Sequence, residues 1–468
     1  MQLNQFKEHI KSYVPFRLTN DQEKLLHVLH DFLSYDIGKK TFVLKGYAGT
    51  GKTTMVSALV KALGKWNYTS MLLAPTGRAA KVLTGYSKRR AFTIHKMIYS
   101  TRRVSGRMQF VLKNNTFKRT IFIIDEASMI GNQAGINGKS LLEDVMSYVY
   151  NGEKCHIIFV GDTAQLPPVH EDVSKALDPM FLTKAYYTNV FTYELEEVVR
   201  QEEDSGILFN ATSIRKDIKR GEGIPKLNDS IGNDVFKITG ETLQEELEDA
   251  YSRNLEGAIV VCRSNKRANL FNQQIRARVL FKEEEIEGGD LMMVVKNNYA
   301  WLPGDSKAGF IANGDIIEIK AIRRIEEIYG FRFATALVKL IDYPDELPFE
   351  TKLFMEAIDI EQTSLPRAKL KELYYAIEED YLEDYPYKKD RIEMILKDPY
   401  FNALQVKFAY AVTCHKSQGG QWDTVFIDQG YLTKEMIDTN YLRWLYTAIT
   451  RAKEKLYLVN FHQDFFQK

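Results

Sequence analysis

The residues Gly46 to Thr53 have the types and the spacing of a phosphate-binding loop. They read Gly-Tyr-Ala-Gly-Thr-Gly-Lys-Thr, which satisfies the pattern of a glycine, four residues and then Gly-Lys-Thr. Glycines let the backbone curl so that successive N–H groups point at phosphate oxygens, and the following helix adds its positive end. We expect Lys52 to reach the β- and γ-phosphates and Thr53 to hold Mg²⁺. The sequence therefore predicts an ATP site formed by Gly46, Ala48, Gly49, Thr50, Gly51, Lys52, Thr53 and Thr54.

Two neighbouring carboxylates, Asp125 and Glu126, follow the apolar run 121–124. A buried parallel strand that ends in carboxylates delivers them to the edge of the sheet where ligands bind. Asp125 is a candidate to hold Mg²⁺, and Glu126 is a candidate to take a proton from the attacking water. An Asp-Glu pair alone is common on protein surfaces, but its pairing with the phosphate loop indicates hydrolysis of ATP.

Three further side chains could act on the phosphates. Gln165 follows the apolar run 157–160 and is placed to orient water, although it could also belong to an ordinary polar loop. Arg200 and Arg451 are candidates to stabilise charge in the transition state, because the guanidinium fork suits phosphate oxygens. A lone arginine is more often a surface residue, so spacing alone does not decide between the two readings.

The elements that must position these groups read as an α/β protein. Short apolar runs suited to buried parallel strands occur at 42–44, 71–73, 121–124 and 157–160, and a second series occurs at 258–261, 409–412, 424–427 and 456–459. Helical stretches separate most of them, which predicts two parallel sheets, one in each half. A basic stretch at 101–119 has the length of a small hairpin, and 290–341 followed by 350–397 reads as an insertion of strands and then helices.

Composition sets the outer limits. A chain of 468 residues is too long for one ordinary domain. Its net charge of +1 means that any basic track for nucleic acid must be local. No apolar run is long enough to span a membrane, the N-terminal segment lacks a signal core, and three scattered cysteines suit a reducing interior. We therefore expect a cytoplasmic location.

Several motifs in order along the chain resemble those of superfamily 1 helicases. They are the phosphate loop, Asp125-Glu126, Gly161-Asp162-x-x-Gln165-Leu166-Pro167-Pro168, Thr413-Cys414-His415-Lys416-Ser417-Gln418-Gly419 and Tyr446-Thr447-Ala448-Ile449-Thr450-Arg451. More narrowly, the chain resembles group B, which contains the Pif, RecD and phage Dda helicases, and the likeness runs from about Leu18 to Val459. The stretch between Glu126 and Gly161 lacks an obvious eukaryotic Pif signature, so a bacterial or phage-infected cell is the expected setting.

The resemblance implies roles that spacing could not. Gln22 is similar to the group that reads the adenine edge, Gln418 and Gly419 approach ATP, and Arg200 and Arg451 become arginine fingers supplied across the cleft from the second domain. The residues implied to contact DNA are Pro75, Thr76, Gly77, Phe92, Thr93, His95, Asn265, Thr413, His415 and Lys416. Read alone, His95 is more often a structural histidine. The implied activity is that of an ATP-dependent 5′–3′ DNA helicase on single-stranded, tailed or forked DNA, working as a monomer in repair or recombination.

The resemblance also implies an architecture. The first RecA-like motor domain is expected at 1–100 and 119–190, with a pin insertion at 101–118. The second RecA-like motor domain is expected at 191–289 and 404–468, with an SH3-like insertion and helical arm at 290–403. Two other functions stay open. A nucleotide-switched module that remodels a protein needs no strand-binding loops, and an RNA helicase of similar design would differ in its preference for RNA tails.

Overall fold

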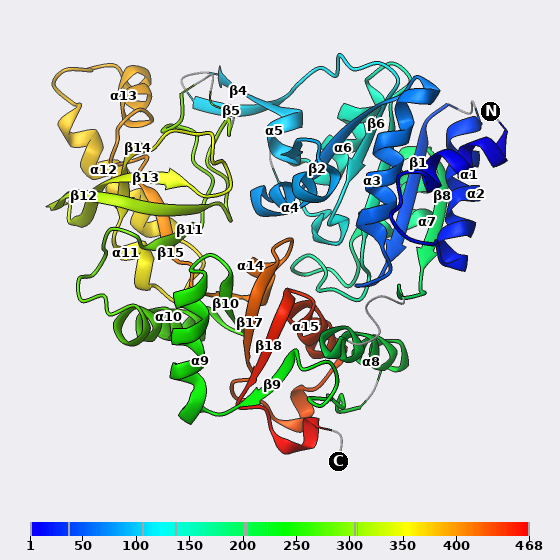
Figure 1. The fold of residues 1–468 in the computed structure, drawn as a ribbon. Helices are drawn as coiled ribbons and strands as arrows, with labels where there is room; N and C mark the ends of the chain where they lie inside the picture. The colour runs from blue at the N-terminus through cyan, green and yellow to red at the C-terminus, as the bar shows by residue number, and fades with distance from the viewer. Residues whose placement is uncertain are drawn as a thin grey trace.

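The computed structural model describes residues 2–35, 38–104, 107–135, 138–199, 205–221, 223–303, 306 and 308–466, with the backbone alone at 101–104 and 107–110. It confirms the predicted fold class: two parallel sheets, each with helices on its faces, are accompanied by a closed barrel and a two-stranded hairpin (Figure 1). None of the helices in these ranges is long and apolar enough to cross a membrane.

The first sheet carries the phosphate loop. All its neighbouring strands are parallel, and in spatial order they are β3 (Ala91–Thr93), β2 (Thr69–Ala74), β6 (Thr120–Ile124), β7 (His156–Gly161), β1 (Lys40–Gly46) and β8 (Asn189–Leu195). One face packs on α1 (Leu3–Lys11), α2 (Asn20–Ser34), α3 (Lys52–Ala62) and α4 (Gly77–Ser87). The other face packs on α5 (Ile94–Ile98), α6 (Leu141–Tyr150) and α7 (Pro179–Tyr186).

The second sheet has five parallel strands. Their spatial order is β16 (Ala411–Thr413), β10 (Ala258–Cys262), β17 (Trp422–Asp428), β18 (Ala452–Val459) and β9 (Val235–Ile238). Its helices are α8 (Gly206–Arg220), α9 (Gly240–Arg253), α10 (Asn265–Gln274), α14 (Cys414–Ser417) and α15 (Thr439–Ile449). Because both sheets are parallel, the loops at their carboxyl ends are the places where ligands can be held.

The barrel closes from β11 (Leu291–Val294), β12 (Ile316–Ile328), β13 (Phe331–Leu340), β14 (Phe349–Phe354) and β15 (Leu404–Phe408). Its core is continuous with that of the second sheet. The short α11 (Glu356–Asp359) follows β14. A separate apolar cluster joins the barrel to two further helices, α12 (Arg367–Asp380) and α13 (Lys388–Ile395). The hairpin pairs β4 (Tyr99–Val104) with β5 (Arg107–Leu112) in antiparallel register.

Three expected boundaries differ from the structure. The second domain was expected to begin at 191, but β8 pairs with β1 as far as Leu195, so the first sheet takes this segment. The insertion was expected to end at 403, but β15 closes the barrel by pairing with β11 through Phe408. The pin was expected at 101–118, whereas the hairpin spans Tyr99–Leu112. The first two differences arise because a strand's sheet is set by its spatial neighbour, and a short apolar run does not reveal which neighbour that is.

Candidate nucleotide site and strand-binding loops

The phosphate loop curls between β1 and α3 as its glycines require. Gly49 and Gly51 have φ angles of 74° and 80°, in the left-handed region that favours glycine. A Cβ atom at Gly46 would lie 2.9 Å from Thr50 Oγ1, so no side chain fits there. Lys52 begins α3, and its Nζ donates to the Tyr47 carbonyl at 2.8 Å. Predicted residues Thr53 and Thr54 lie in the first turn of the same helix. The loop therefore fits a polyphosphate.

Carboxylates gather beside this loop at the ends of β6 and β7. Burial raises the pKa of Asp125 to about 6, and the neighbouring charge of Glu126 adds to the effect. Asp125 is half-buried, whereas Asp162, directly after β7, is fully buried, and burial also raises the pKa of Asp162. The Lys52 ammonium acts in the opposite direction on both groups. Buried carboxylates of this kind are most easily ionised next to a cation, which suits a divalent metal ion.

The described residues contain no cluster of three or more His, Cys, Asp or Glu side chains that could hold a metal ion by themselves. Mg²⁺ usually keeps water ligands and is held by one or two protein groups together with substrate phosphates. Asp125 and the Thr53 hydroxyl are sufficient for such a site, so the residues present fit a magnesium ion that arrives with a nucleotide.

The second sheet closes the other side of the site through α15. Tyr446 is buried, its hydroxyl donates to Asp162 Oδ2 at 2.6 Å, and it accepts a hydrogen bond from the Ala48 N–H at 2.9 Å. Thr447 Oγ1 accepts from the Leu166 N–H at 2.8 Å, and Gln418 Nε2 donates to the Leu166 carbonyl at 2.7 Å. These contacts tie the phosphate loop and the loop after β7 to the second domain.

Tyr446 was not predicted as a site residue, although it lies in a motif that the sequence displayed. A signal was available, because a buried tyrosine hydroxyl usually needs a polar partner. The identity of that partner, about 280 residues away in the chain, could only come from the fold.

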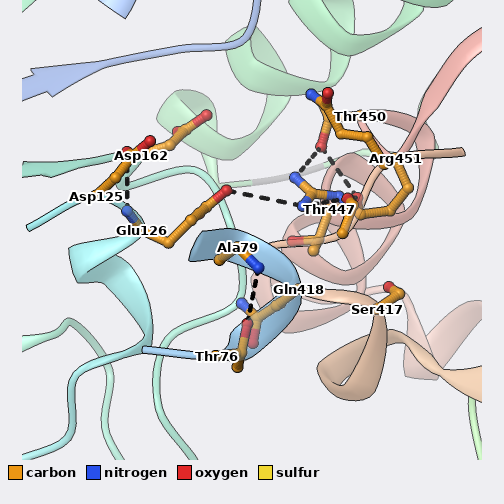
Figure 2. Close-up of polar contacts among 12 residues, drawn as sticks. Thr76, Ala79, Asp125, Glu126, Asp162, Ser417, Gln418, Thr447, Thr450 and Arg451 are labelled. Carbon is orange, nitrogen blue, oxygen red and sulfur yellow. Dashed lines mark hydrogen bonds and ion pairs between the residues drawn. The ribbon is translucent and has the colours of Figure 1, made fainter. Parts of the chain in front are cut away.

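Arg451 approaches the carboxylates from the second domain (Figure 2). It is 3% exposed, and its guanidinium donates to the carbonyls of Thr447 and Gly420 and to Thr450 Oγ1. Its NH1 lies 3.9 Å from Glu126 Oε1, across the cleft. Arginine in this position can respond to charge that develops near Glu126.

Gln165 is also buried, and its side-chain Oε1 has no hydrogen-bond partner among the described residues. Since a buried unsatisfied carbonyl oxygen is costly, a bound water or ligand is the natural partner. Gln165 thus lies in the loop that follows β7, and its side-chain oxygen Oε1 can accept a hydrogen bond.

Gln22 contacts the phosphate loop directly. Together with Thr19 it forms a capping box at the start of α2, and its Nε2 donates to the Thr50 carbonyl at 3.1 Å. Arg200 lies outside the described residues. The Val199 N–H just before it donates to the Gly49 carbonyl at 3.0 Å, so this segment leaves β8 along the phosphate loop of the first domain. On the other side of the undescribed stretch, Ser205 caps α8 of the second domain, so the segment that holds Arg200 runs between the two domains.

The predicted strand-binding residues lie at the carboxyl ends of neighbouring strands. In the first domain, Thr76 caps α4 after β2, and Thr93 caps α5 after β3. Pro75 and Gly77 flank the first cap, and Phe92 in β3 and His95 in α5 lie on either side of the second. Burial lowers the pKa of His95, which favours the neutral imidazole.

The second domain presents its predicted strand-binding residues in the same way. Asn265 starts α10 after β10. Thr413 ends β16, the strand that pairs with β10, and His415 and Lys416 follow in α14. The Lys416 Nζ contacts Asn313 of the barrel, and burial lowers the pKa of Lys416 to about 8.

The two sets of loops adjoin. A Cβ atom at Gly419 would lie 2.7 Å from Ala79 Cβ and 3.3 Å from Thr76 Oγ1. The guanidinium carbon of Arg78 lies 4.0 Å from the Trp422 ring centroid, and Arg78 also donates to the Gln421 carbonyl. The segment that follows β2 therefore lies directly against the segment between β16 and β17.

Comparison with known proteins gives two family matches. Residues 19–230 match the AAA domain family, and residues 408–459 match the UvrD-like helicase C-terminal domain family. The chain is 24% identical to the ATP-dependent DNA helicase Dda of Enterobacteria phage T4, over 90% of this chain and 94% of that protein. It is also 24% identical to a protein of Acanthamoeba polyphaga mimivirus, over 89% and 94% of the two chains. The crystal structure of Pif1 helicase from Bacteroides in complex with ADP-AlF3 and single-stranded DNA aligns with 97% of this chain and 95% of its own, at 15% identity and a TM-score of 0.47.

Proposed function

We propose that the chain belongs to the Pif-type group of superfamily 1 helicases and that it is an ATP-dependent DNA helicase, which moves 5′ to 3′ on single-stranded DNA and unwinds duplex DNA. The proposal rests chiefly on one observation. Tyr446 lies in α15 of the second domain, and its buried hydroxyl bonds both to the phosphate loop and to Asp162 of the first domain. A ligand between these parts must alter how the two domains pair.

The nucleotide would be held by the first domain. We assign the phosphates to the loop N–H groups of Gly46–Thr53 and to Lys52, the adenine edge to Gln22, and Mg²⁺ to Thr53 and Asp125. When bound, Mg²⁺–ATP supplies the phosphoryl group and neutralises charge on the phosphates. Lys52 must leave the Tyr47 carbonyl to reach them, and its stem at the start of α3 is already directed into the loop.

Hydrolysis would use residues from both domains. Glu126 is the proposed acceptor of the proton from the attacking water, and Gln165 the proposed group that orients that water. Arg451, held within 3.9 Å of Glu126, would stabilise the charge that develops on the phosphoryl oxygens. Arg200 is proposed for the same task beside the loop. Because Arg451 belongs to the second domain and Glu126 to the first, opening of the cleft would separate them, and closure would thereby be coupled to hydrolysis.

Closure would become movement through the strand-binding loops. The first-domain residues Pro75, Thr76, Gly77, Phe92, Thr93 and His95, and the second-domain residues Asn265, Thr413, His415 and Lys416, are proposed to grip the strand in alternation. Gln418 and Gly419 follow directly after the second grip and contact the first domain, so they would carry the state of the nucleotide site to the strand. Both halves of the cleft come from one chain, which supports action as a monomer.

The first test is ATP hydrolysis with and without single-stranded DNA. We expect strong stimulation by DNA in the wild type and loss of turnover in Lys52→Ala. Lys61→Ala, at an exposed position of the same helix, is the matched control. Unstimulated turnover in the wild type, or full activity in Lys52→Ala, would contradict the proposal and would favour a nucleotide-switched binding module.

The second test measures unwinding of duplexes with a 5′ tail, a 3′ tail or a 5′ RNA tail. Activity on the 5′ DNA tail alone is the expected result. Equal activity with the RNA tail would instead indicate an RNA helicase of similar design. We propose that the protein acts in the cytoplasm of a bacterial or phage-infected cell, in repair or recombination of DNA, supported by its likeness to the phage T4 helicase over nearly the whole length of both chains.

A further inference from the structure

The face of the first domain opposite the nucleotide cleft carries two adjoining hollows. They lie where β1, β2, β6 and β7 begin, whereas the phosphate loop lies where β1 ends. Each has a volume of about 550 Å³. Lys39 and Tyr150 line both, so the hollows form one continuous surface, which we call the basal face. None of the residues assigned above to ATP, metal or strand binding lies on it.

The basal face is positively charged. Lys39, Arg119 and Lys154 line the first hollow, and Lys39 and Lys113 line the second; all four side chains are exposed. No Asp or Glu occurs among the described residues that line either hollow. The chain as a whole has a net charge of only +1, so this local imbalance is the kind of footprint that an anionic polymer requires.

Aromatic rings alternate with these cations. Tyr35 is 54% exposed at the rim of the first hollow, and Tyr187 is 88% exposed at the rim of the second. Deeper in, the Lys39 ammonium lies 5.5 Å from the Tyr150 ring centroid, and the Arg119 guanidinium carbon lies 5.0 Å from that of Tyr68. Cations that follow a backbone, interleaved with rings on which bases stack, are the features of a surface for single-stranded nucleic acid.

The basal face begins at the foot of the β4–β5 hairpin. Leu112, the last residue of β5, lines the second hollow together with Lys113 and Asn114. The Lys113 N–H donates to the Ile98 carbonyl at 2.7 Å and closes the base of the hairpin. If the hairpin is the wedge that parts the duplex, a strand that leaves it on this side meets the second hollow first and the first hollow next.

We propose that the basal face binds the displaced strand of the DNA fork, as single-stranded DNA held through its phosphates by Lys39, Lys113, Arg119 and Lys154 and through its bases by Tyr35 and Tyr187. The inference rests on the proposed helicase function. It adds a second strand site, on the opposite side of the first domain from the cleft. Holding the displaced strand there opposes reannealing behind the wedge and favours forks over tailed duplexes.

The test compares equilibrium binding of three DNAs by fluorescence anisotropy without nucleotide. All have the same duplex and 5′ tail; the first has a displaced 3′ tail, the second has none, and the third has a displaced tail with an uncharged methylphosphonate backbone. Relative to the DNA without a displaced tail, we expect the charged tail to raise affinity about fivefold or more, which is the effect of one stacked base. The uncharged tail should raise affinity by less than half as much. Equal binding of all three DNAs by the wild type would overturn the proposal.

The double variant Lys39→Gln/Lys154→Gln should lose at least half of the preference for the first DNA over the second. Its salt dependence on the fork should be shallower by about 1.4 in log–log slope, for two lost single-strand phosphate contacts. The matched control Lys61→Gln/Lys216→Gln changes two exposed lysines that line neither hollow and should behave as the wild type. A double variant that keeps the full tail preference of the wild type overturns the proposal. In the double variant, stimulation of ATP hydrolysis by single-stranded DNA should be the same as in the wild type. If the wild type itself shows no such stimulation, the result counts against the helicase function and not against the basal face.

Discussion

Replacing Tyr446 with phenylalanine removes one hydroxyl group that joins the two halves of the nucleotide cleft. The wild-type hydroxyl donates to the buried Asp162 carboxylate at 2.6 Å and accepts from the Ala48 N–H at 2.9 Å. Phenylalanine keeps the ring and its packing in α15, so the change is confined to these two hydrogen bonds. Tyr446 bonds to the backbone of the phosphate loop and to Asp162, neither of which is proposed as a reacting group, so we regard it as a positioning residue for closure of the cleft.

The size of the effect follows from the chemistry of the two bonds. A hydrogen bond to a charged group contributes about 1.5–3 kcal/mol, and one between neutral groups about 0.5–1.5 kcal/mol. The Ala48 N–H is half-buried and can turn to water, so most of the loss comes from Asp162. A cost of about 2 kcal/mol corresponds to roughly a 30-fold fall in kcat/KM for ATP, provided that the closed cleft is the catalytic state.

The assay is DNA-stimulated ATP hydrolysis over a range of pH, with Tyr457→Phe as the matched control. The Tyr457 hydroxyl also donates to a carboxylate, that of Glu246 at 2.7 Å, but within the second domain. Both variants should lose similar thermal stability, and Tyr446→Phe alone should lose activity. The Tyr446 hydrogen bond lowers the pKa of Asp162, so its removal raises that pKa and moves the acidic limb of the profile to higher pH. Activity of Tyr446→Phe within about twofold of wild type, with both variants equally destabilised, would refute the reasoning.

Three other outcomes are expected. Arg451→Lys keeps the charge but removes the guanidinium that bonds the carbonyls of Thr447 and Gly420 and the hydroxyl of Thr450. Single-turnover hydrolysis should therefore fall by about 10³-fold, while binding of a fluorescent ATP analogue persists. An unchanged rate would exclude a role in the transition state. Because the pKa of Asp125 is raised to about 6, affinity for Mg²⁺–ATP in calorimetry should fall about tenfold per pH unit below pH 6 in the wild type, and an equally steep fall in Asp125→Asn would contradict the assignment. Burial raises the pKa of Asp315 from 3.8 to about 8, so the folded state holds this proton more tightly than the unfolded chain does. As the pH rises from 4 to 8, the free energy of unfolding should therefore fall by up to about 1.4 kcal/mol per pH unit. Chemical denaturation at several pH values should show that Asp315→Asn lacks this part of the slope.

The strand–loop–helix geometry at Gly46–Thr53 was predictable because its signals are local. A phosphate loop needs glycines at fixed positions between a strand and a helix, and a run such as 121–124 followed by Asp125 can only present the carboxylate at the end of a buried strand. The paired loops after β2 and β3, and after β10 and β16, were also suggested by motifs, since each lies at a strand end. That both pairs adjoin through Gly419 and Ala79 was not visible in the chain.

The partners of these residues could not be read in the same way. Tyr446, Arg451 and Gln418 meet the first domain only because α15 and the loop after β16 are folded against it, across more than 250 residues of chain. Likewise, β8 resembles a strand of either sheet until its register with β1 is known. The basal face draws on segments from Tyr35 to Tyr187, and no single segment is basic and aromatic enough to be noticed.

The sequence by itself determined that this protein has an α/β fold with a phosphate loop at Gly46–Thr53, because loop curvature, strand burial and charge placement depend on residues within a few positions of one another. The tertiary structure alone decided which strand joins which sheet, which hydroxyl links the two domains and where cations gather on the far side of the first. Each of those properties depends on residues that are distant in the chain but adjacent in space, and the periodicity of a sequence does not show which residues become neighbours.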